Sequence, residues 1–73
     1  DAEGYKARRK KQIEREAFRR AEEALKRGRS VQLNPMTAAE RKIVHIALRD
    51  RSDVTTVSEG REPNRSVVIS PVE

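Results

Sequence analysis

Apolar residues return every three to four positions along the first third of the chain, as they do along one side of an α-helix. This stripe occupies an arc of about 140° on a helical wheel and consists of Ile13, Ala17, Ala21, Ala24 and Leu25, with Phe18 at its margin. Most of the other positions are Lys, Arg and Glu. Gly28 suits the end of a helix, and the charges of Lys26 and Arg27 favour that end. The pattern predicts a long amphipathic helix from Tyr5 to Lys26.

A second helix is expected after Asn34-Pro35, which ends the extended segment before it. Thr37 and Glu40 have the spacing of a capping box, in which each side chain bonds to the backbone N–H of the other residue. The helix is expected to run from Ala38 to Asp50. Its expected apolar side consists of Ala39, Ile43, Val44, Ile46, Ala47 and Leu48.

Three further segments have the alternating, β-branched composition of strands, namely Ser30–Leu33, Val54–Ser58 and Arg65–Ser70. The segment Glu59–Asn64 joins the last two with Gly and Pro, which predicts a β-hairpin, and Pro71 ends its second strand. The order α-β-α-β-β predicts an α+β fold. The five elements share one core if both helices cover the same face of the sheet, so the other face is left to solvent or to a partner.

Length and charge narrow the class of protein. Seventy-three residues allow a single domain with a thin core, and 40 % of them are charged. The grouping of the apolar residues argues against disorder, which such a charge fraction otherwise favours. A net charge of +5 predicts attraction to polyanions, foremost nucleic acid. The chain has no Cys and one His, so we expect no disulfide, no metal site and no cofactor.

The apolar runs also bear on location. None approaches the ~20 residues of a membrane span, and the start of the chain lacks the apolar core of a signal peptide. We therefore expect a cytoplasmic protein with no membrane partner. We also expect the chain, which starts at Asp1 without an initiator Met, to be a fragment of a longer protein.

The second expected helix carries the most informative chemistry. Its basic groups occupy an arc of about 100° opposite the expected apolar side and are Arg41, Lys42, His45 and Arg49. Arg41 and His45 are four residues apart, so both side chains can reach one ligand group. A guanidinium binds phosphate oxygens through a planar fork of donors, and an imidazole donates to phosphate or stacks on a base. The alternative is a solvated polar face, with His45 bonded to a loop carbonyl, and spacing alone leaves both open.

Three strings of the sequence resemble one known family. They are Leu33-Asn34-Pro35-Met36, Glu40-Arg41-Lys42-Ile43-Val44-His45 and the segment from Thr56 to Arg65. Together they resemble the R-3-H domain, named for its Arg-x-x-x-His motif, in the form found at the C-terminus of bacterial Jag, or SpoIIIJ-associated, proteins. The two motif residues alone match many proteins by chance, whereas the combined strings are specific. The resemblance spans Tyr5 to Pro71.

The resemblance implies a three-stranded antiparallel sheet with two helices on one side. It also implies sequence-tolerant binding of single-stranded RNA or DNA, in cytoplasmic proteins tied to cell elongation and, in spore formers, to sporulation. In such proteins a KH domain, itself an RNA binder, precedes this domain. Residues 1–5 are therefore expected to be a linker, and residues 6–73 the R-3-H domain.

Two further surfaces are candidates for contact with nucleic acid. The expected hairpin offers hydroxyl, backbone N–H and guanidinium donors to phosphate from Ser58, Gly60, Arg61 and Arg65. Alternatively, this loop only shapes the turn, and Glu59 pairs with Arg41 or Arg65. The basic start of the chain is either a solvated helix end or an auxiliary electrostatic contact, and consists of Lys6, Arg8, Arg9, Lys10 and Lys11.

We therefore expect a module that binds single-stranded nucleic acid, with phosphates held by Arg41, Lys42 and Arg49. The alternative is an adaptor whose basic face docks on an acidic protein or on its own KH domain. We expect no enzyme and no small-molecule substrate, because acid–base catalysis needs a second catalytic group besides the single His45. With Tyr5 and Phe18 as the only aromatic residues, stacking is scarce, so binding should be weak and salt-sensitive.

Overall fold

The computed structural model describes the backbone of residues 2–72 and the side chains of residues 4–72. The elements are α1 (Ala2–Arg27), β1 (Val31–Gln32), α2 (Ala38–Leu48), β2 (Val54–Glu59) and β3 (Ser66–Pro71), which confirms the α+β fold and its α-β-α-β-β order. α1 starts at Ala2 rather than at Tyr5, because a single Gly costs a helix only about 1 kcal/mol and Gly4 does not stop it. Residues 2–5, which were expected to be part of a linker, thus lie in α1. Asp1 of that linker and Glu73 of the expected domain lie outside the described residues.

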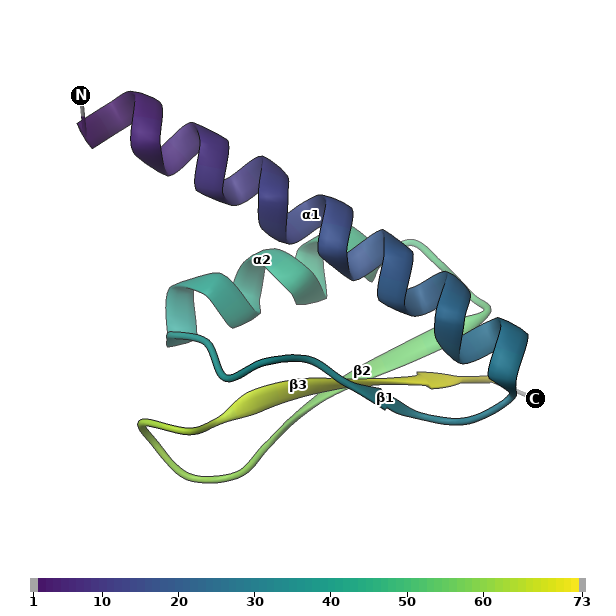
Figure 1. Cartoon of the computed structure of the whole chain (residues 1–73). Coiled ribbons are helices and arrows are strands. Elements are labelled where there is room, and N and C mark those ends of the chain that lie inside the picture. Colours follow the sequence, from purple (N-terminus) through teal and green to yellow (C-terminus); the bar gives the residue numbers. More distant parts are fainter. Residues whose placement is uncertain (1, 73) are drawn as a thin grey trace.

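The sheet is antiparallel, with β3 between β1 and β2 (Figure 1). β2 and β3 form the predicted hairpin, in which Val57 lies opposite Val68. β1 has two residues rather than the expected four. The Leu33 N–H still donates to the Val67 carbonyl at 2.9 Å, but Pro35 has no N–H to continue the pairing.

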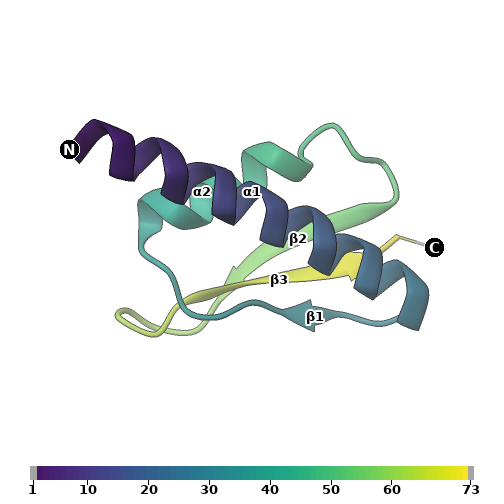
Figure 2. The ribbon, with the colours of Figure 1, turned by 45° about the horizontal axis from the view of Figure 1, so that its top comes forward.

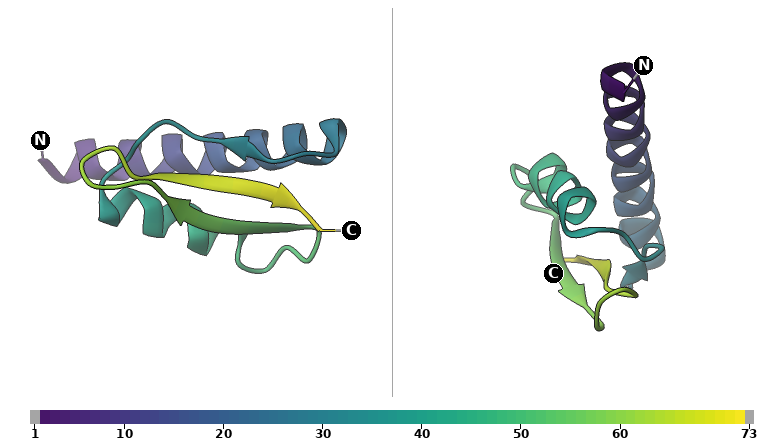
Figure 3. Two further views of the ribbon diagram at one scale, coloured as in Figure 1. Left: turned by 90° about the horizontal axis from the view of Figure 1, so that it is seen from below. Right: turned by 90° about the vertical axis from the view of Figure 1, so that its left-hand side faces the viewer.

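Both helices cover the same face of the sheet, as predicted (Figure 3). The first turns of α1 project past the start of α2, at the end of the molecule where the β2–β3 loop also lies (Figures 1 and 2). The opposite end holds the turn from α1 into β1, where Gly28 adopts a φ of 68° and ends α1, as predicted. The starts of both helices and the hairpin loop therefore lie at the same end of the molecule, with the first turns of α1 on the side away from the loop (Figures 1 and 3).

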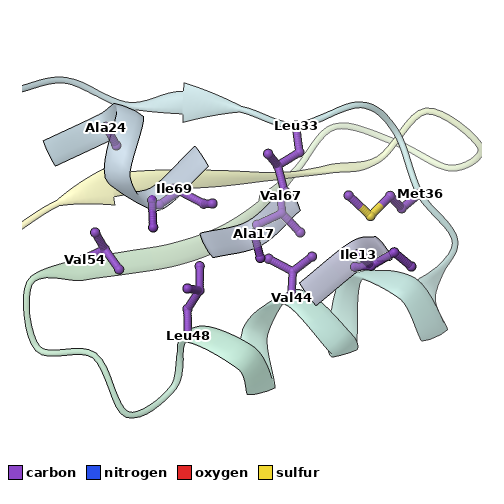
Figure 4. Packing of buried hydrophobic residues seen from close by; sticks show 11 residues of the cluster. Ile13, Ala17, Ala24, Leu33, Met36, Val44, Leu48, Val54, Val67 and Ile69 are labelled. Carbon is purple, nitrogen blue, oxygen red and sulfur yellow. The ribbon is translucent and has the colours of Figure 1, made fainter. Parts of the chain in front are cut away.

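The core lies between the helices and the sheet (Figure 4) and consists of Ile13, Ala17, Ala21, Ala24, Leu33, Met36, Val44, Leu48, Val54, Val67 and Ile69. α1 contributes mostly Ala, and small side chains allow a helix to lie close to the layer below it. Tyr5 and Phe18 are both exposed, so the core formed by residues 4–72 contains no aromatic ring. The core is as thin as the length of the chain predicts.

α2 turns a different side to the core from the one that its apolar residues predict. Thr37 and Glu40 form the predicted capping box, and the helix ends at Leu48, before the expected Asp50. Ile46, expected on the apolar side, is 47 % exposed, and Ala39 is exposed as well. The buried residues of α2 are Arg41, Val44 and Leu48. The buried side is thus rotated by roughly a quarter turn toward Arg41, which hydrogen-bond partners outside the helix make possible.

Candidate nucleic-acid interface

Arg41 lies on the buried side of α2, near the start of the helix. Its Nη1 donates to the Met36 carbonyl at 2.7 Å, and its Nη2 donates to Glu62 Oε1 at 2.8 Å. Only 9 % of the Arg41 side chain is exposed. The expectation of an exposed basic arc is therefore wrong for Arg41, because two oxygens from other segments stabilise its charge inside the fold.

His45 lies one turn further along α2, above strand β2. Its Nδ1 is 2.7 Å from Thr56 Oγ1 and its Nε2 is 3.1 Å from Ser58 Oγ. A hydroxyl can donate or accept, so the two hydroxyls match a neutral imidazole with one N–H. Burial lowers the pKa of His45, and the nearby positive charge of Arg41 lowers it further. His45 is therefore a neutral link between helix and strand at pH 7, and its partners are strand hydroxyls rather than a loop carbonyl.

Arg65 closes the loop between β2 and β3. Its Nη1 donates to the Gly60 carbonyl at 2.9 Å and its Nη2 to the Ser58 carbonyl at 3.3 Å. Gly60 has a φ of 100°, and a Cβ there would lie 3.1 Å from the carbonyl oxygen of Asn64, so the position requires Gly. Arg65 thus holds the loop through carbonyls, and none of the described carboxylates compensates the charge of its guanidinium.

The residues that meet here form one group, which we call the Arg41–His45 cluster and which consists of Arg41, His45, Ser58, Glu62 and Arg65. Ser58 joins two of them, since its hydroxyl contacts His45 and its carbonyl accepts from Arg65. Glu62, rather than Glu59, is the acid that pairs with Arg41. Glu62 gave no signal in the sequence, because the pairing spans 21 positions and no helical or strand spacing connects them.

Lys42 and Arg49 do not join this cluster. Lys42 lines a shallow groove between the helices, together with Lys10, Glu14 and Ile46. Arg49 follows the last residue of α2 and is exposed, with its Nε 4.0 Å from Asp50 Oδ1. The expected arc therefore divides into a pair bonded within the fold, the buried Arg41 and the half-buried His45, and two exposed cations that face other directions.

The basic start of the chain is mostly solvent-exposed. Arg9 is the exception, because its Nε donates to Glu40 Oε2 at 2.9 Å, which ties α1 to α2. That hydrogen bond holds the pKa of the Glu40 carboxyl below its usual range. Arg8, Lys11 and Arg15 line one shallow groove on α1. Arg15 was missed in the sequence, although its spacing of four from Lys11 and seven from Arg8 marks one helix face.

Ion pairs leave many cations of residues 4–72 uncompensated. Within that range, no carboxylate lies at ion-pair distance from Lys6, Arg8, Lys10, Lys11, Arg15, Lys26, Arg29, Lys42, Arg61 and Arg65. Two of them, Arg61 and Arg65, belong to the β2–β3 loop. The helix starts and this loop lie at one end of the molecule (Figure 1), and both the helix layer and the sheet layer there contribute cations that have no carboxylate partner within residues 4–72.

Two other kinds of site are absent from the described part of the chain. Neither α1 nor α2 combines the length and the apolar character needed to cross a membrane. Among residues 4–72, no three His, Asp or Glu side chains converge to hold a metal ion.

Comparison with known proteins gives the family. The model of the R-3-H domain matches residues 8–71. Three relatives are named RNA-binding protein KhpB. The protein from Lactiplantibacillus plantarum is 41 % identical over 96 % of this chain, that from Clostridium symbiosum 44 % over 96 %, and that from Bacillus subtilis 40 % over 96 %. The chain spans 22 %, 32 % and 35 % of the length of these three proteins, respectively. The chain belongs to the R-3-H domain family.

Proposed function

We propose that this domain binds single-stranded nucleic acid, RNA in the first place, through the β2–β3 loop and the surface next to the Arg41–His45 cluster. The observation that carries the proposal is a pair of loop guanidiniums, Arg61 and Arg65, which have no carboxylate partner among residues 4–72 and lie beside the family's motif residues. The name RNA-binding protein given to three relatives supports RNA as the ligand.

The residues of the interface take different roles in this proposal. Arg61, Arg65 and the Gly60 backbone contact phosphates, because a guanidinium and a backbone N–H both donate to anionic oxygens. Arg41 and His45 act mainly by holding the loop and Ser58 in place. The exposed Lys42 and Arg49 are secondary contacts, and the basic start of α1 adds attraction without positioning.

The residue types at this surface also determine how strongly the domain is expected to bind. The Arg41–His45 cluster contains no Phe, Tyr or Trp, so their stacking on bases, which contributes about 1–3 kcal/mol per base in other single-strand binders, is lacking. If roughly three phosphates are contacted, log K should fall with log salt at a slope near −2. We therefore propose that the domain binds weakly alone and gains affinity by tethering to another binding domain of a longer protein.

The wider setting rests on the same relatives and on the resemblance to Jag proteins. We propose an upstream KH domain as that tethered neighbour, residues 6–73 as the R-3-H unit, and residues 1–5 as the linker, of which residues 2–5 continue α1. We further propose that the parent protein acts in the cytoplasm without catalysis, in processes connected with cell elongation and, in spore formers, with sporulation.

The proposal is tested by fluorescence anisotropy with a labelled single-stranded RNA of about 12 nucleotides and two matched variants. Arg61→Gln removes a loop cation whose side chain makes no ion pair and no hydrogen bond within residues 4–72 of the free domain. We expect binding to weaken about two- to fivefold, with a salt slope that is less steep by about 0.7. Arg29→Gln removes an equally unpaired cation at the opposite end of the sheet and should leave binding nearly unchanged. Equal binding by both variants would favour the adaptor function instead.

A further inference from the structure

The two arms of the Arg41 guanidinium are held in unequal ways. Nη1 donates to the backbone carbonyl of Met36, a buried residue of the core. Nη2 donates to the carboxylate of Glu62, whose side chain is 60 % exposed. Releasing the carbonyl would leave a buried acceptor without a donor, whereas Glu62 can exchange its partner for water at little cost. The Glu62 arm is therefore the exchangeable one.

Glu62 offers Nη2 an anionic oxygen, and a phosphate group can offer the same kind of acceptor. Carboxylate and phosphate both present anionic oxygens to the planar fork of a guanidinium. Glu62 lies in the loop between β2 and β3, one position from Arg61 and three from Arg65. Neither of these cations has a carboxylate partner among the described side chains. A phosphate that reaches the loop thus meets two guanidiniums that lack a counter-charge and one that is already neutralised.

We propose that Glu62 occupies an anion position on Arg41 Nη2 that a backbone phosphate takes when single-stranded nucleic acid binds. Glu62 then acts as an internal competitor that limits affinity, and its release adds Arg41 to the contacts of Arg61 and Arg65. This inference rests on the proposed function, because it names the regulation of the same site. By this step Arg41, whose side chain is 9 % exposed in the free domain, adds a direct phosphate contact to its role of holding the loop.

The test compares two nearby glutamates, Glu62 in the β2–β3 loop and Glu59 at the end of β2, of which only Glu62 pairs with Arg41. Glu62→Gln and Glu59→Gln each raise the net charge by one, but Glu59, which ends β2, forms no ion pair within residues 4–72. With the same labelled RNA, both variants should bind somewhat more tightly than the wild type through charge alone. We expect E62Q to bind at least about threefold more tightly than E59Q, with a salt slope steeper by about 0.7. Equal affinity of the two variants, or weaker binding by E62Q, would overturn the proposal.

A second measurement on the wild-type chain does not depend on any variant. Adding the same RNA should shift the NMR signals of the Arg41 side-chain nitrogens and of the Glu62 carboxyl carbon, while the Glu59 carboxyl carbon stays nearly unmoved. Unchanged Arg41 and Glu62 signals at saturation would overturn the displacement step. If instead the wild type, E59Q and E62Q all fail to bind, and Arg61→Gln changes nothing, the proposed function itself is wrong.

Discussion

The domain holds its positive charge in two contrasting ways. In the Arg41–His45 cluster every basic side chain is bonded to the protein, by a carbonyl and a carboxylate at Arg41 and by carbonyls at Arg65. Along the start of α1, Arg8, Lys11 and Arg15 are exposed and make no ion pair with the described side chains. In the first region hydrogen bonds fix the basic side chains in place, whereas in the second region the basic side chains are close together but are not held by ion pairs. Changes in the cluster should therefore alter stability as well as binding, whereas changes on α1 should alter binding alone and only at low salt.

The largest effect is expected from Arg41→Met, which keeps much of the side-chain volume and removes the guanidinium. The Met36 carbonyl loses its donor and Glu62 loses its ion pair. We expect the free energy of unfolding to fall by about 1–3 kcal/mol in urea titrations. The control is Arg8→Met, an exposed change on α1 that should stay within about 0.5 kcal/mol of the wild type. Equal losses in the two variants would remove the contrast between the regions.

A smaller effect concerns the pH dependence of stability. Because burial lowers the pKa of His45, the unfolded chain binds the proton more readily than the folded one. Stability should therefore be complete above about pH 6.5, the usual value for an imidazole, and should decline as the pH falls through the lowered pKa. His45→Gln should abolish that decline, as measured by urea titrations at several pH values.

The pH effect can be assigned to a single imidazole, because His45 is the only His of the chain. Hydrogen bonds from arginines lower the pKa values of Glu16, Glu40 and Asp53, so these carboxyls also cause a loss of stability, but at more acidic pH. That acidic branch should survive in the variant. A decline just below about pH 6.5 that persists in His45→Gln would assign it to another group.

The smallest effect is expected from the double change Lys11→Gln and Arg15→Gln on α1. Affinity for single-stranded RNA at about 50 mM salt should fall about two- to threefold, and the difference should fade near about 300 mM, because exposed charges are screened. The free energy of unfolding should not change, since neither side chain makes an ion pair within residues 4–72. A loss of affinity that persists at high salt would place α1 among the positioned contacts.

Local patterns predicted most of the fold. The Ala-rich stripe from Ala17 to Ala24 indicated α1, the spacing of Thr37 and Glu40 indicated the start of α2, and β-branched runs around Gly60 indicated the hairpin. Each of these signals arises within a few residues of the element that it predicts. Such signals reflect backbone preference and helix or strand periodicity, which a sequence displays directly.

The rotation of α2 and the composition of the site could not be predicted in this way. A helical wheel places Arg41 among the polar residues, and its burial depends on Glu62, which is distant in sequence. The same rotation leaves Ile46 exposed and separates Lys42 from the cluster. A helical wheel gives the relative directions of the side chains, but only the surrounding segments decide which direction is inward.

We propose that the β2–β3 loop and the Arg41–His45 cluster, rather than the free charges of α1, form the principal contact surface. NMR shift perturbation of the isotope-labelled domain with a short single-stranded RNA distinguishes the two surfaces. The largest backbone shifts should fall on residues 58–65 and on His45, with smaller shifts over residues 6–15. Shifts confined to residues 6–15, with the β2–β3 loop unmoved, would contradict it.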